Sequence, residues 1–177
     1  TPKLRSIVET ALMDMIEDGS AQDAVIAQNE SQRRTMWERR EAYAEITLGI
    51  AGSIDTDIAV PLDNVPAFLE QVSSRVKEID PTGEELYISH LGDGNLHYTF
   101  YPSDSSGLLK EPITEAIEDV VLALNGSFSA EHGIGLSKKS SMARRKDPIA
   151  LEMMSAIKTA FDPKNLMNPG KVYPEKG

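Results

Sequence analysis

The segment His90-Leu91-Gly92-Asp93-Gly94-Asn95-Leu96-His97 lies between two runs with the alternation of β-strands. Residues 84–90 form the first run, and residues 96–101 form the second. Alternate residues of a strand point to the same face, so Leu86, Ile88 and His90 share one face. The glycines between the runs accept positive φ angles, which a tight turn requires. The segment therefore predicts a β-hairpin with one histidine at the turn end of each strand.

A second segment, Ser129-Ala130-Glu131-His132-Gly133-Ile134-Gly135, contains the remaining histidine of a chain that has only three. A single histidine on a strand is more often a core or surface residue than a ligand. Several titratable groups are costly to bury together unless they are paired or bind a metal, so the grouping favours a site. Two imidazoles and a carboxylate with an open position form a ligand set of catalytic zinc and other divalent metals. We therefore expect His90, His97 and Glu131 to bind a metal.

The pattern around the hairpin predicts the fold class. In chain order we expect a strand at Ile54–Val60, a helix capped by Asp63 or Asn64, the hairpin, a helix over residues 113–124 and a strand at Ser127–Ala130. The order β-α-β-β-α-β is that of an α+β, ferredoxin-like arrangement, an antiparallel sheet backed by helices on one face.

Further elements are expected at both ends of the chain. The N-terminal part predicts a helix from Pro2 that ends at Gly19, a buried strand at residues 23–28 and a helix capped by Asn29 or Ser31. This second helix runs to about Leu48 and buries a side that contains Met36, Trp37, Tyr43 and Ala44. The C-terminal part predicts helices from about Ser137 and from Pro148, followed by a turn-rich tail at residues 162–171. The apolar residues of the last helix, at helical spacing, predict core packing.

Composition limits the class of protein. The chain has 177 residues, 40% hydrophobic and 26% charged, as in one globular domain of ordinary size. A net charge of -10 repels phosphate backbones, so nucleic-acid binding is not expected. No apolar run reaches the length of a membrane span, and the absence of cysteine permits a reducing compartment, so we expect a cytoplasmic protein. The chain does not begin with Met, which suggests a fragment of a longer chain.

Three motifs together resemble one family. The segment at residues 90–97, the run Glu131-His132-Gly133-Ile134-Gly135 and the terminal Asn168-Pro169-Gly170-Lys171 resemble the C-terminal domain of FAD-linked oxidases. This group of flavoenzymes includes D-lactate dehydrogenases, the glycolate oxidase flavin subunit and D-2-hydroxyglutarate dehydrogenases. The resemblance runs from about residue 2 to residue 174. It implies that residues 1–177 are the substrate and metal domain of an FAD-dependent 2-hydroxy-acid dehydrogenase, without its FAD-binding domain.

The resemblance also implies roles for single residues. His132 would remove the proton of the substrate hydroxyl, for which an imidazole with a pKa near neutrality is suited. Arg40, in Trp37-Glu38-Arg39-Arg40-Glu41, would bind the substrate carboxylate, although charge patterning alone favours a solvated helix face. Asn168 and Lys171 would lie near the flavin, with a plain C-terminal loop as the equal alternative. Asp55 stands where many members have a lysine, which disfavours a dicarboxylate substrate.

The implied cofactors and partners follow from the same resemblance. They are FAD, a divalent metal with zinc as the first candidate, a small 2-hydroxy acid, the FAD-binding domain of the same parent chain and an unidentified electron acceptor. A homodimer is a candidate assembly. The basic run from Lys138 to Lys146 could face a flavin pyrophosphate, but a solvated helix face is preferred. Two alternatives stay open, a metal-dependent hydrolase with the same ligands and a non-catalytic metal-binding module.

Overall fold

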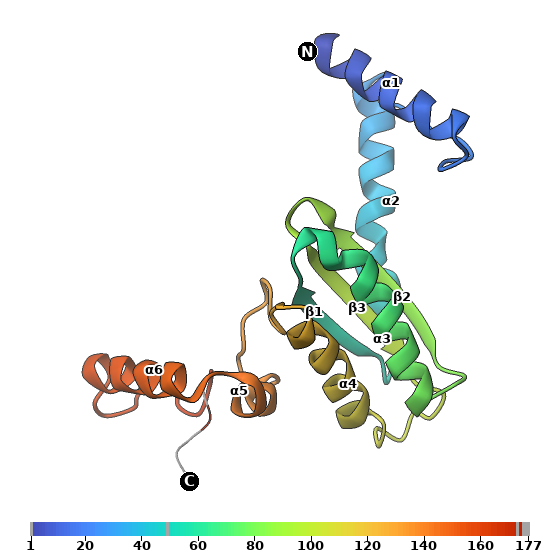
Figure 1. Ribbon diagram of the computed structural model, residues 1–177. Coiled ribbons are helices and arrows are strands. Elements are labelled where there is room, and N and C mark those ends of the chain that lie inside the picture. The colour runs from blue at the N-terminus through green and yellow to red at the C-terminus, as the bar shows by residue number, and fades with distance from the viewer. Residues whose placement is uncertain (1, 49, 173, 175–177) are drawn as a thin grey trace. The chain divides into compact units, whose positions relative to one another are not determined.

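The computed structural model describes residues 2–48, 50–172 and 174 (Figure 1). The chain divides into two compact units, residues 1–46 and residues 47–177. The first unit contains helices, and the second contains a small antiparallel sheet with helices on it. The candidate ligand histidines all belong to the second unit.

Two helices form the first unit. Helix α1 spans Pro2–Glu17, and helix α2 spans Glu30–Leu48, most of which lies in this unit. The predicted cap at Asn29 is confirmed, because its Oδ1 accepts a hydrogen bond of 3.0 Å from the Gln32 N–H. Where their side chains are described, the apolar faces of both helices are less buried than expected; Ala44, which was also expected on the buried side, lies outside that part. Trp37, predicted to be buried, is 52% exposed, and several apolar residues of α1 are exposed as well: Leu4, Ile7, Val8, Met15 and Ile16.

The strand predicted at residues 23–28 is wrong. The structure assigns no strand there, and Val25 is 73% exposed. Local hydrogen bonds to side chains occupy backbone N–H groups that would otherwise pair with a neighbouring strand. The Ala24 N–H donates to Asp23 Oδ1, and the Gln28 N–H donates to Gln32 Oε1. A strand is stable only beside a hydrogen-bonded neighbour, and short polar side chains that bond to nearby backbone favour irregular structure instead.

The sheet of the second unit has three strands in the order β1-β3-β2, with both pairings antiparallel (Figure 1). They are β1 (Ile54–Ala59), β2 (Glu84–His90) and β3 (Asn95–Tyr101). The predicted hairpin of β2 and β3 is confirmed. Its turn contains the short 3-10 helix η2 (Leu91–Asp93) and Gly94, which has a φ of +76°. In this register His97 lies opposite Asp57 on one side and Ile88 on the other.

The fourth strand predicted at Ser127–Ala130 is reduced to a single bridge between Ala59 and Ser127. Ser127 exchanges both backbone hydrogen bonds with Ala59, at 2.7 and 2.9 Å. After it, the Ser127 hydroxyl bonds to the Ser129 carbonyl and turns the chain away from the sheet. The α+β class and the order β-α-β-β-α are therefore confirmed, and the closing strand is wrong.

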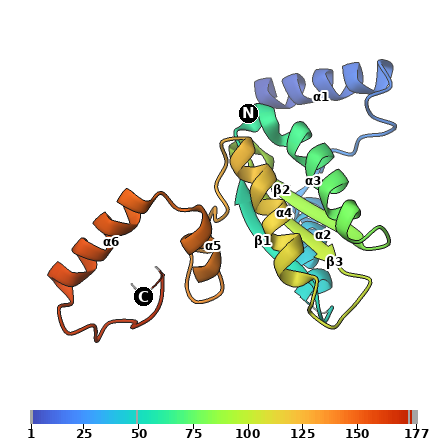
Figure 2. The same cartoon turned by 60° about the horizontal axis from the view of Figure 1, so that its bottom comes forward.

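Helices cover one face of the sheet. They are α3 (Val65–Ile79), which follows the 3-10 helix η1 (Leu62–Asn64), and α4 (Lys110–Ala123). Figure 2 shows α3 and α4 side by side over the strands. The predicted side-chain cap at Asp63 or Asn64 does not form, since the Asn64 amide donates to the Leu124 carbonyl instead.

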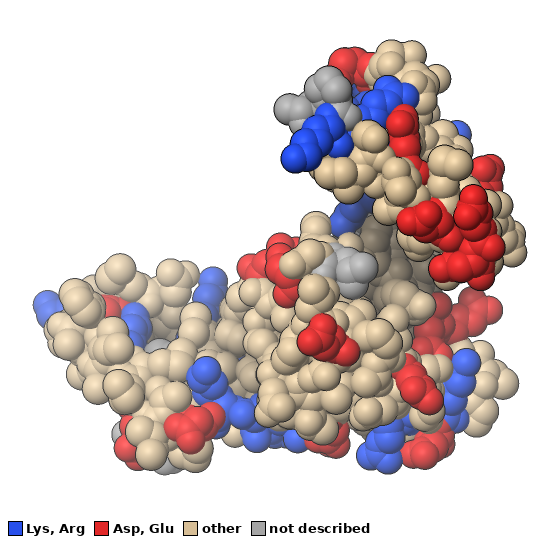
Figure 3. Space-filling model, turned by 45° about the horizontal axis from the view of Figure 1, so that its top comes forward, with Lys and Arg blue, Asp and Glu red and all other residues tan. Residues whose placement is uncertain are grey.

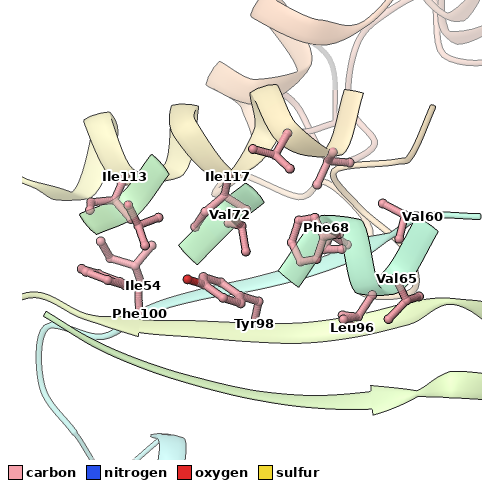
Figure 4. Close-up of a cluster of buried hydrophobic side chains, with 14 residues drawn as sticks. Ile54, Val60, Val65, Phe68, Val72, Leu96, Tyr98, Phe100, Ile113 and Ile117 are labelled. Atoms are coloured by element: carbon pink, nitrogen blue, oxygen red, sulfur yellow. The ribbon is translucent and has the colours of Figure 1, made fainter. Parts of the chain in front are cut away.

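The core lies between these helices and the sheet (Figure 4). Phe68 of α3 and Ile117 of α4 pack over Leu96, Tyr98 and Phe100 of β3, and all five are fully buried. Burial of such side chains stabilises a fold by about 1.5–3 kcal/mol each. Because alternate residues of β3 point to the helices, His97 and Thr99 point to the opposite face. The core thereby fixes the face on which the histidines lie.

The C-terminal part contains α5 (Lys139–Arg145) and α6 (Pro148–Phe161). The predicted core packing of α6 is wrong, since none of its residues is buried and Phe161 is 84% exposed.

The solvated face predicted for the basic run from Lys138 to Lys146 is also wrong near the end of the run, where two arginines form ion pairs with α4. Arg144 pairs with Glu111 and Glu115 of α4. Arg145 pairs with Asp119, 2.7 Å from its Nη1, and with the buried Glu118, 3.2 Å from its Nε.

The face that Figure 3 presents carries Lys and Arg as well as Asp and Glu, and several of the acidic residues gather at its right. The net charge of -10 differs from the basic charge of nucleic-acid binding proteins. None of the described helices combines the length and the apolar character that a membrane crossing requires.

Candidate functional site

The hairpin places two histidines beside each other. His90 ends β2 and His97 lies in β3, and their ring centroids are 5.4 Å apart at an interplanar angle of 80°. The side chain of His97 is 19% exposed, whereas that of His90 is 46% exposed. The left-handed Gly94 closes the turn between the two strands, so the sequence of the hairpin itself creates this pair.

The carboxylate of Glu131 lies among all three imidazoles. Its Oε1 is 3.1 Å from Nε2 of His97, 3.6 Å from Nε2 of His132 and 3.8 Å from Nε2 of His90. The rings of His97 and His132 are stacked, with centroids 5.2 Å apart and an interplanar angle of 19°. The structure therefore brings together the four residues that the sequence singled out as ligands and base.

Asp57 is a fifth member of the site, although no sequence pattern predicted a role for it. Its side chain is 2% exposed, and its carboxylate accepts hydrogen bonds from the N–H groups of Glu131 and His132 at 2.9–3.2 Å. Asp57, His97, Glu131 and His132 each offer a ligand atom within 4.8 Å of the others. One signal was available: a carboxylate inside an otherwise buried strand must find a partner, because an unpaired buried charge is costly.

The environment shifts the pKa of two of these groups. Burial lowers the pKa of His97, and the opposing attraction of the Glu131 carboxylate does not restore it. Burial acts to raise the pKa of Asp57, but the N–H groups of His132 and Glu131 and the ammonium of Lys138 hold it below its usual value. At neutral pH His97 is therefore a neutral imidazole and Asp57 an anion. These are the forms that bind a metal and that accept hydrogen bonds, respectively.

The donor set fits a divalent metal ion. Three imidazole nitrogens around one carboxylate oxygen match the nitrogen and oxygen ligands of zinc and related metals. His90 and His132 are almost equally far from Glu131 Oε1, at 3.8 and 3.6 Å, so distance alone does not separate a ligand from a base. The arrangement can hold one cation and leave one imidazole to accept a proton.

Three other residues were predicted to take part in a site. Arg40 belongs to α2 in the first unit, where its side chain is half-buried, and its role stays a prediction. Asn168 and Lys171 are exposed and lie on one turn after α6, in which the Lys171 N–H donates to the Asn168 carbonyl at 3.4 Å. Their predicted place near a flavin likewise stays a prediction.

Grooves elsewhere on the second unit do not coincide with the histidines. One of about 550 Å³ runs along α3 and β2 and is lined by Ser73, Lys77, Glu85 and Tyr87. The histidine cluster is the stronger candidate for the functional site, because such a site is identified by the chemistry of convergent groups and not by volume alone.

Comparison with known proteins places the chain in a family. Residues 2–172 match the family described as FAD linked oxidases, C-terminal domain. The chain is 34% identical over 163 residues to a D-2-hydroxyglutarate dehydrogenase of Stutzerimonas stutzeri (strain A1501), with 89% of this chain and 35% of that protein covered.

Two further relatives are similar to this chain at nearly the same sequence identity. The chain is 33% identical over 168 residues to a probable mitochondrial D-2-hydroxyglutarate dehydrogenase of Oryza sativa subsp. indica, covering 95% of this chain and 30% of that protein. It is 32% identical over 165 residues to a probable mitochondrial D-lactate dehydrogenase of Danio rerio, covering 90% of this chain and 33% of that protein. The chain thus spans about a third of the length of these relatives. Because the family match extends over nearly the whole chain, the chain belongs to the FAD linked oxidases, C-terminal domain family.

Proposed function

We propose that this chain is the substrate- and metal-binding part of an FAD-dependent dehydrogenase that oxidises a small 2-hydroxy acid to the 2-oxo acid. A D-lactate-like or glycolate-like compound is the proposed substrate. One observation carries the proposal: three imidazoles surround the Glu131 carboxylate in a chain of the FAD-linked oxidase family. Arg40 is the proposed contact to the substrate carboxylate.

Each residue has a proposed role. His90, His97 and Glu131 would hold a divalent metal, with zinc as the first candidate, which supplies Lewis acidity toward the substrate oxygens. His132 would accept the hydroxyl proton at its ring nitrogen, since it is adjacent to the proposed ligands and its side chain is 61% exposed. FAD, bound mainly by a separate portion of the parent protein, supplies the acceptor for the hydride. Asn168 and Lys171 are the proposed contacts of this chain to the flavin.

The proposed substrate class is a monocarboxylate. Asp55 precedes Asp57 by two residues in β1 and therefore points to the same face of the sheet as Asp57 and His97. Its carboxylate accepts hydrogen bonds from Ser53 and Thr99 at 2.8 and 2.9 Å. An anion at this position repels a second substrate carboxylate, which supports lactate or glycolate over 2-hydroxyglutarate.

The test uses a flavoprotein that contains this chain. D-lactate is mixed with it without oxygen, and bleaching of the flavin absorbance is followed before and after removal of metal with a chelator. The proposal expects fast bleaching, its loss after chelation and its return with Zn²⁺ or another divalent ion. Bleaching that chelation leaves unchanged would contradict the metal role. Metal-dependent ester or amide hydrolysis without flavin reduction would instead support a hydrolase.

Assembly, acceptor and compartment are parts of the same proposal. A homodimer, an electron acceptor and a cytoplasmic location are proposed, the last because the chain has no cysteine. Two of the relatives named above are described as mitochondrial, so the compartment is open to a direct test. Sedimentation of the purified protein and fractionation of cells that express it would decide the first and third points.

A further inference from the structure

Asp57 is a buried carboxylate beside the proposed ligands. It lies in β1 directly opposite His97 of β3, and 2% of its side chain is exposed. A buried carboxylate is stable only when its oxygens accept hydrogen bonds or meet a cation. The groups that meet its oxygens therefore show what Asp57 does in this fold.

Three successive N–H groups converge on one oxygen of Asp57. Its Oδ2 accepts from Ala130 at 3.2 Å, from Glu131 at 3.1 Å and from His132 at 2.9 Å. Consecutive N–H groups around an anion form a nest, which fixes the backbone that supplies them. Two of these residues, Glu131 and His132, carry side chains that meet His97. Asp57 thus holds the backbone from which these two side chains of the site extend.

Lys138 completes the arrangement from the other side. Its Nζ lies 3.2 Å from Asp57 Oδ2 and 2.9 Å from the Ser129 hydroxyl, which in turn donates to the Gly133 carbonyl at 3.0 Å. The ammonium is thereby connected to both ends of the loop at residues 129–133. With 19% of its side chain exposed, Lys138 is engaged within the fold and not part of a solvated face.

We propose that Asp57 and Lys138 are a positioning pair that holds Glu131 and His132 against His97, and that Asp57 Oδ2 serves this loop and not a metal. The inference rests on the proposed function for the use that the site makes of this geometry. Asp57 Oδ2 receives three N–H groups and an ammonium, so this oxygen has no lone pair free for a metal, whereas Oδ1 accepts only from the Glu131 N–H, at 3.2 Å. A cation bound to the same oxygen would also be repelled by Lys138.

The first test needs no metal. NMR spectra of the metal-free chain should show ring-to-ring NOEs between His97 and His132, and slow exchange of the N–H groups of residues 130–132. Asp57→Asn should lose these NOEs and exchange those N–H groups at least about tenfold faster, because the charge that fixes the nest is gone. NOEs and protection that persist in Asp57→Asn would overturn the proposal.

Asp80 provides a matched control. It is 3% exposed and its carboxylate also accepts from a backbone N–H, that of Ser103 at 2.7 Å, and from the Ser103 hydroxyl at 2.8 Å. It has no place in the histidine cluster. Asp80→Asn should therefore lower the unfolding midpoint as Asp57→Asn does, yet leave the NOEs between His97 and His132 intact. Loss of the NOEs in both variants would reduce Asp57 to a structural residue.

The second test uses Co²⁺, whose visible spectrum reports its coordination. Asp57→Asn should raise the dissociation constant of Co²⁺ by about 10- to 100-fold, as loss of a group that orients ligands does, without changing the spectrum of the bound ion. A changed spectrum would identify Asp57 as a ligand and overturn the proposal. If Asp57→Asn does not fold, Lys138→Met replaces it. This variant should raise the dissociation constant of Co²⁺ by a smaller factor, and an unchanged dissociation constant would contradict the positioning pair.

The outcomes separate this inference from the proposed function. If the wild-type chain binds no Co²⁺, and the NOEs between His97 and His132 are present in wild type but lost in Asp57→Asn, the metal role is refuted and the positioning pair is kept. A chain that binds Co²⁺ equally well with and without Asp57, with NOEs intact, would keep the metal role and refute the pair.

Discussion

Glu131 and His132 are neighbours in the sequence, but the proposed chemistry gives them different tasks. Glu131 Oε1 lies 3.1 Å from His97 Nε2, and the ring of His132 stacks on the ring of His97. His132→Ala should keep the metal and reduce turnover by roughly 10²- to 10⁴-fold, the usual effect of losing a positioned base. Elemental analysis and the pH profile of kcat, in a flavoprotein that contains this chain, measure the two effects.

The same measurements on His90→Ala and Glu131→Ala serve as comparison. Both should lose metal, and turnover with it, because ligand removal takes the ion from the site. His132→Ala losing the metal while His90→Ala keeps it would exchange the roles of these two histidines. That result is compatible with their similar distances to Glu131 Oε1, 3.6 and 3.8 Å, and would contradict the present assignment.

Arg40 tests the substrate contact at the same scale. Arg40→Lys should lower kcat/KM for 2-hydroxy acids about tenfold or more, about 1.4 kcal/mol, because an ammonium cannot reproduce bidentate contact with a carboxylate. Arg39→Lys is the matched control, since Arg39 is exposed and has no proposed contact to substrate. Steady-state kinetics measure both. Equal kcat/KM in wild type and Arg40→Lys would leave Arg40 as a residue of the helix surface.

Residues of the site were predictable to the extent that local pattern determines them. The sequence placed His90 and His97 at one turn because glycine chemistry and strand alternation are local, and the structure confirms the hairpin. Asp57 was missed because its partners are 73–81 residues away in sequence. No local pattern shows which backbone N–H groups will surround a buried carboxylate.

At the scale of elements, the hairpin turn depends on one of its two glycines. Gly94 has a φ of +76°, and a Cβ on it would lie 2.1 Å from the Val60 carbonyl oxygen. Gly94→Ala should therefore destabilise the fold by about 1–3 kcal/mol, the usual cost of a strained backbone. Gly92→Ala meets nothing within 4 Å and should change stability by less than about 0.5 kcal/mol. Urea unfolding measures both, and equal midpoints for the two variants would contradict this account of the turn.

The turn after α6 is held by Asp162. A hydrogen bond from Lys158, followed by the N–H groups of Met167 and Leu166, lowers the pKa of this carboxyl from 3.8 to about 2. A depressed pKa means that the folded turn favours the anion, so its contribution to stability is present above pH 3.8 and disappears as the pH falls through about 2. An NMR titration should find this low pKa, and Lys158→Met should raise it. An ordinary pKa in the wild-type chain would contradict the ion pair.

Elements were predicted better than their packing. The helices at Pro2 and Pro148 begin where the sequence places them, yet their apolar faces are exposed. A periodic apolar stripe predicts a helix and a face to bury, but not the partner that buries it. The strands expected at residues 23–28 and 127–130 failed for a related reason, because ladder formation depends on a neighbour that a strand sequence does not specify.

At the scale of the whole molecule, the α+β class was predictable because one face of the sheet is covered by two helices with strong periodicity. Phe68 and Ile117 are examples of the pattern, and both are fully buried. The dehydrogenase role rests on three motifs and on relatives of which the chain covers about a third.

The central claim is that the histidine cluster binds one divalent metal ion. The most direct measurement is equilibrium dialysis of the chain against Zn²⁺ near pH 7.5, followed by elemental analysis. The account predicts about one ion per chain in wild type and a large loss in His97→Ala, since His97 Nε2 lies 3.1 Å from the Glu131 carboxylate and is the least exposed of the three imidazoles. No bound ion in wild type, or the same occupancy in His97→Ala, would contradict it.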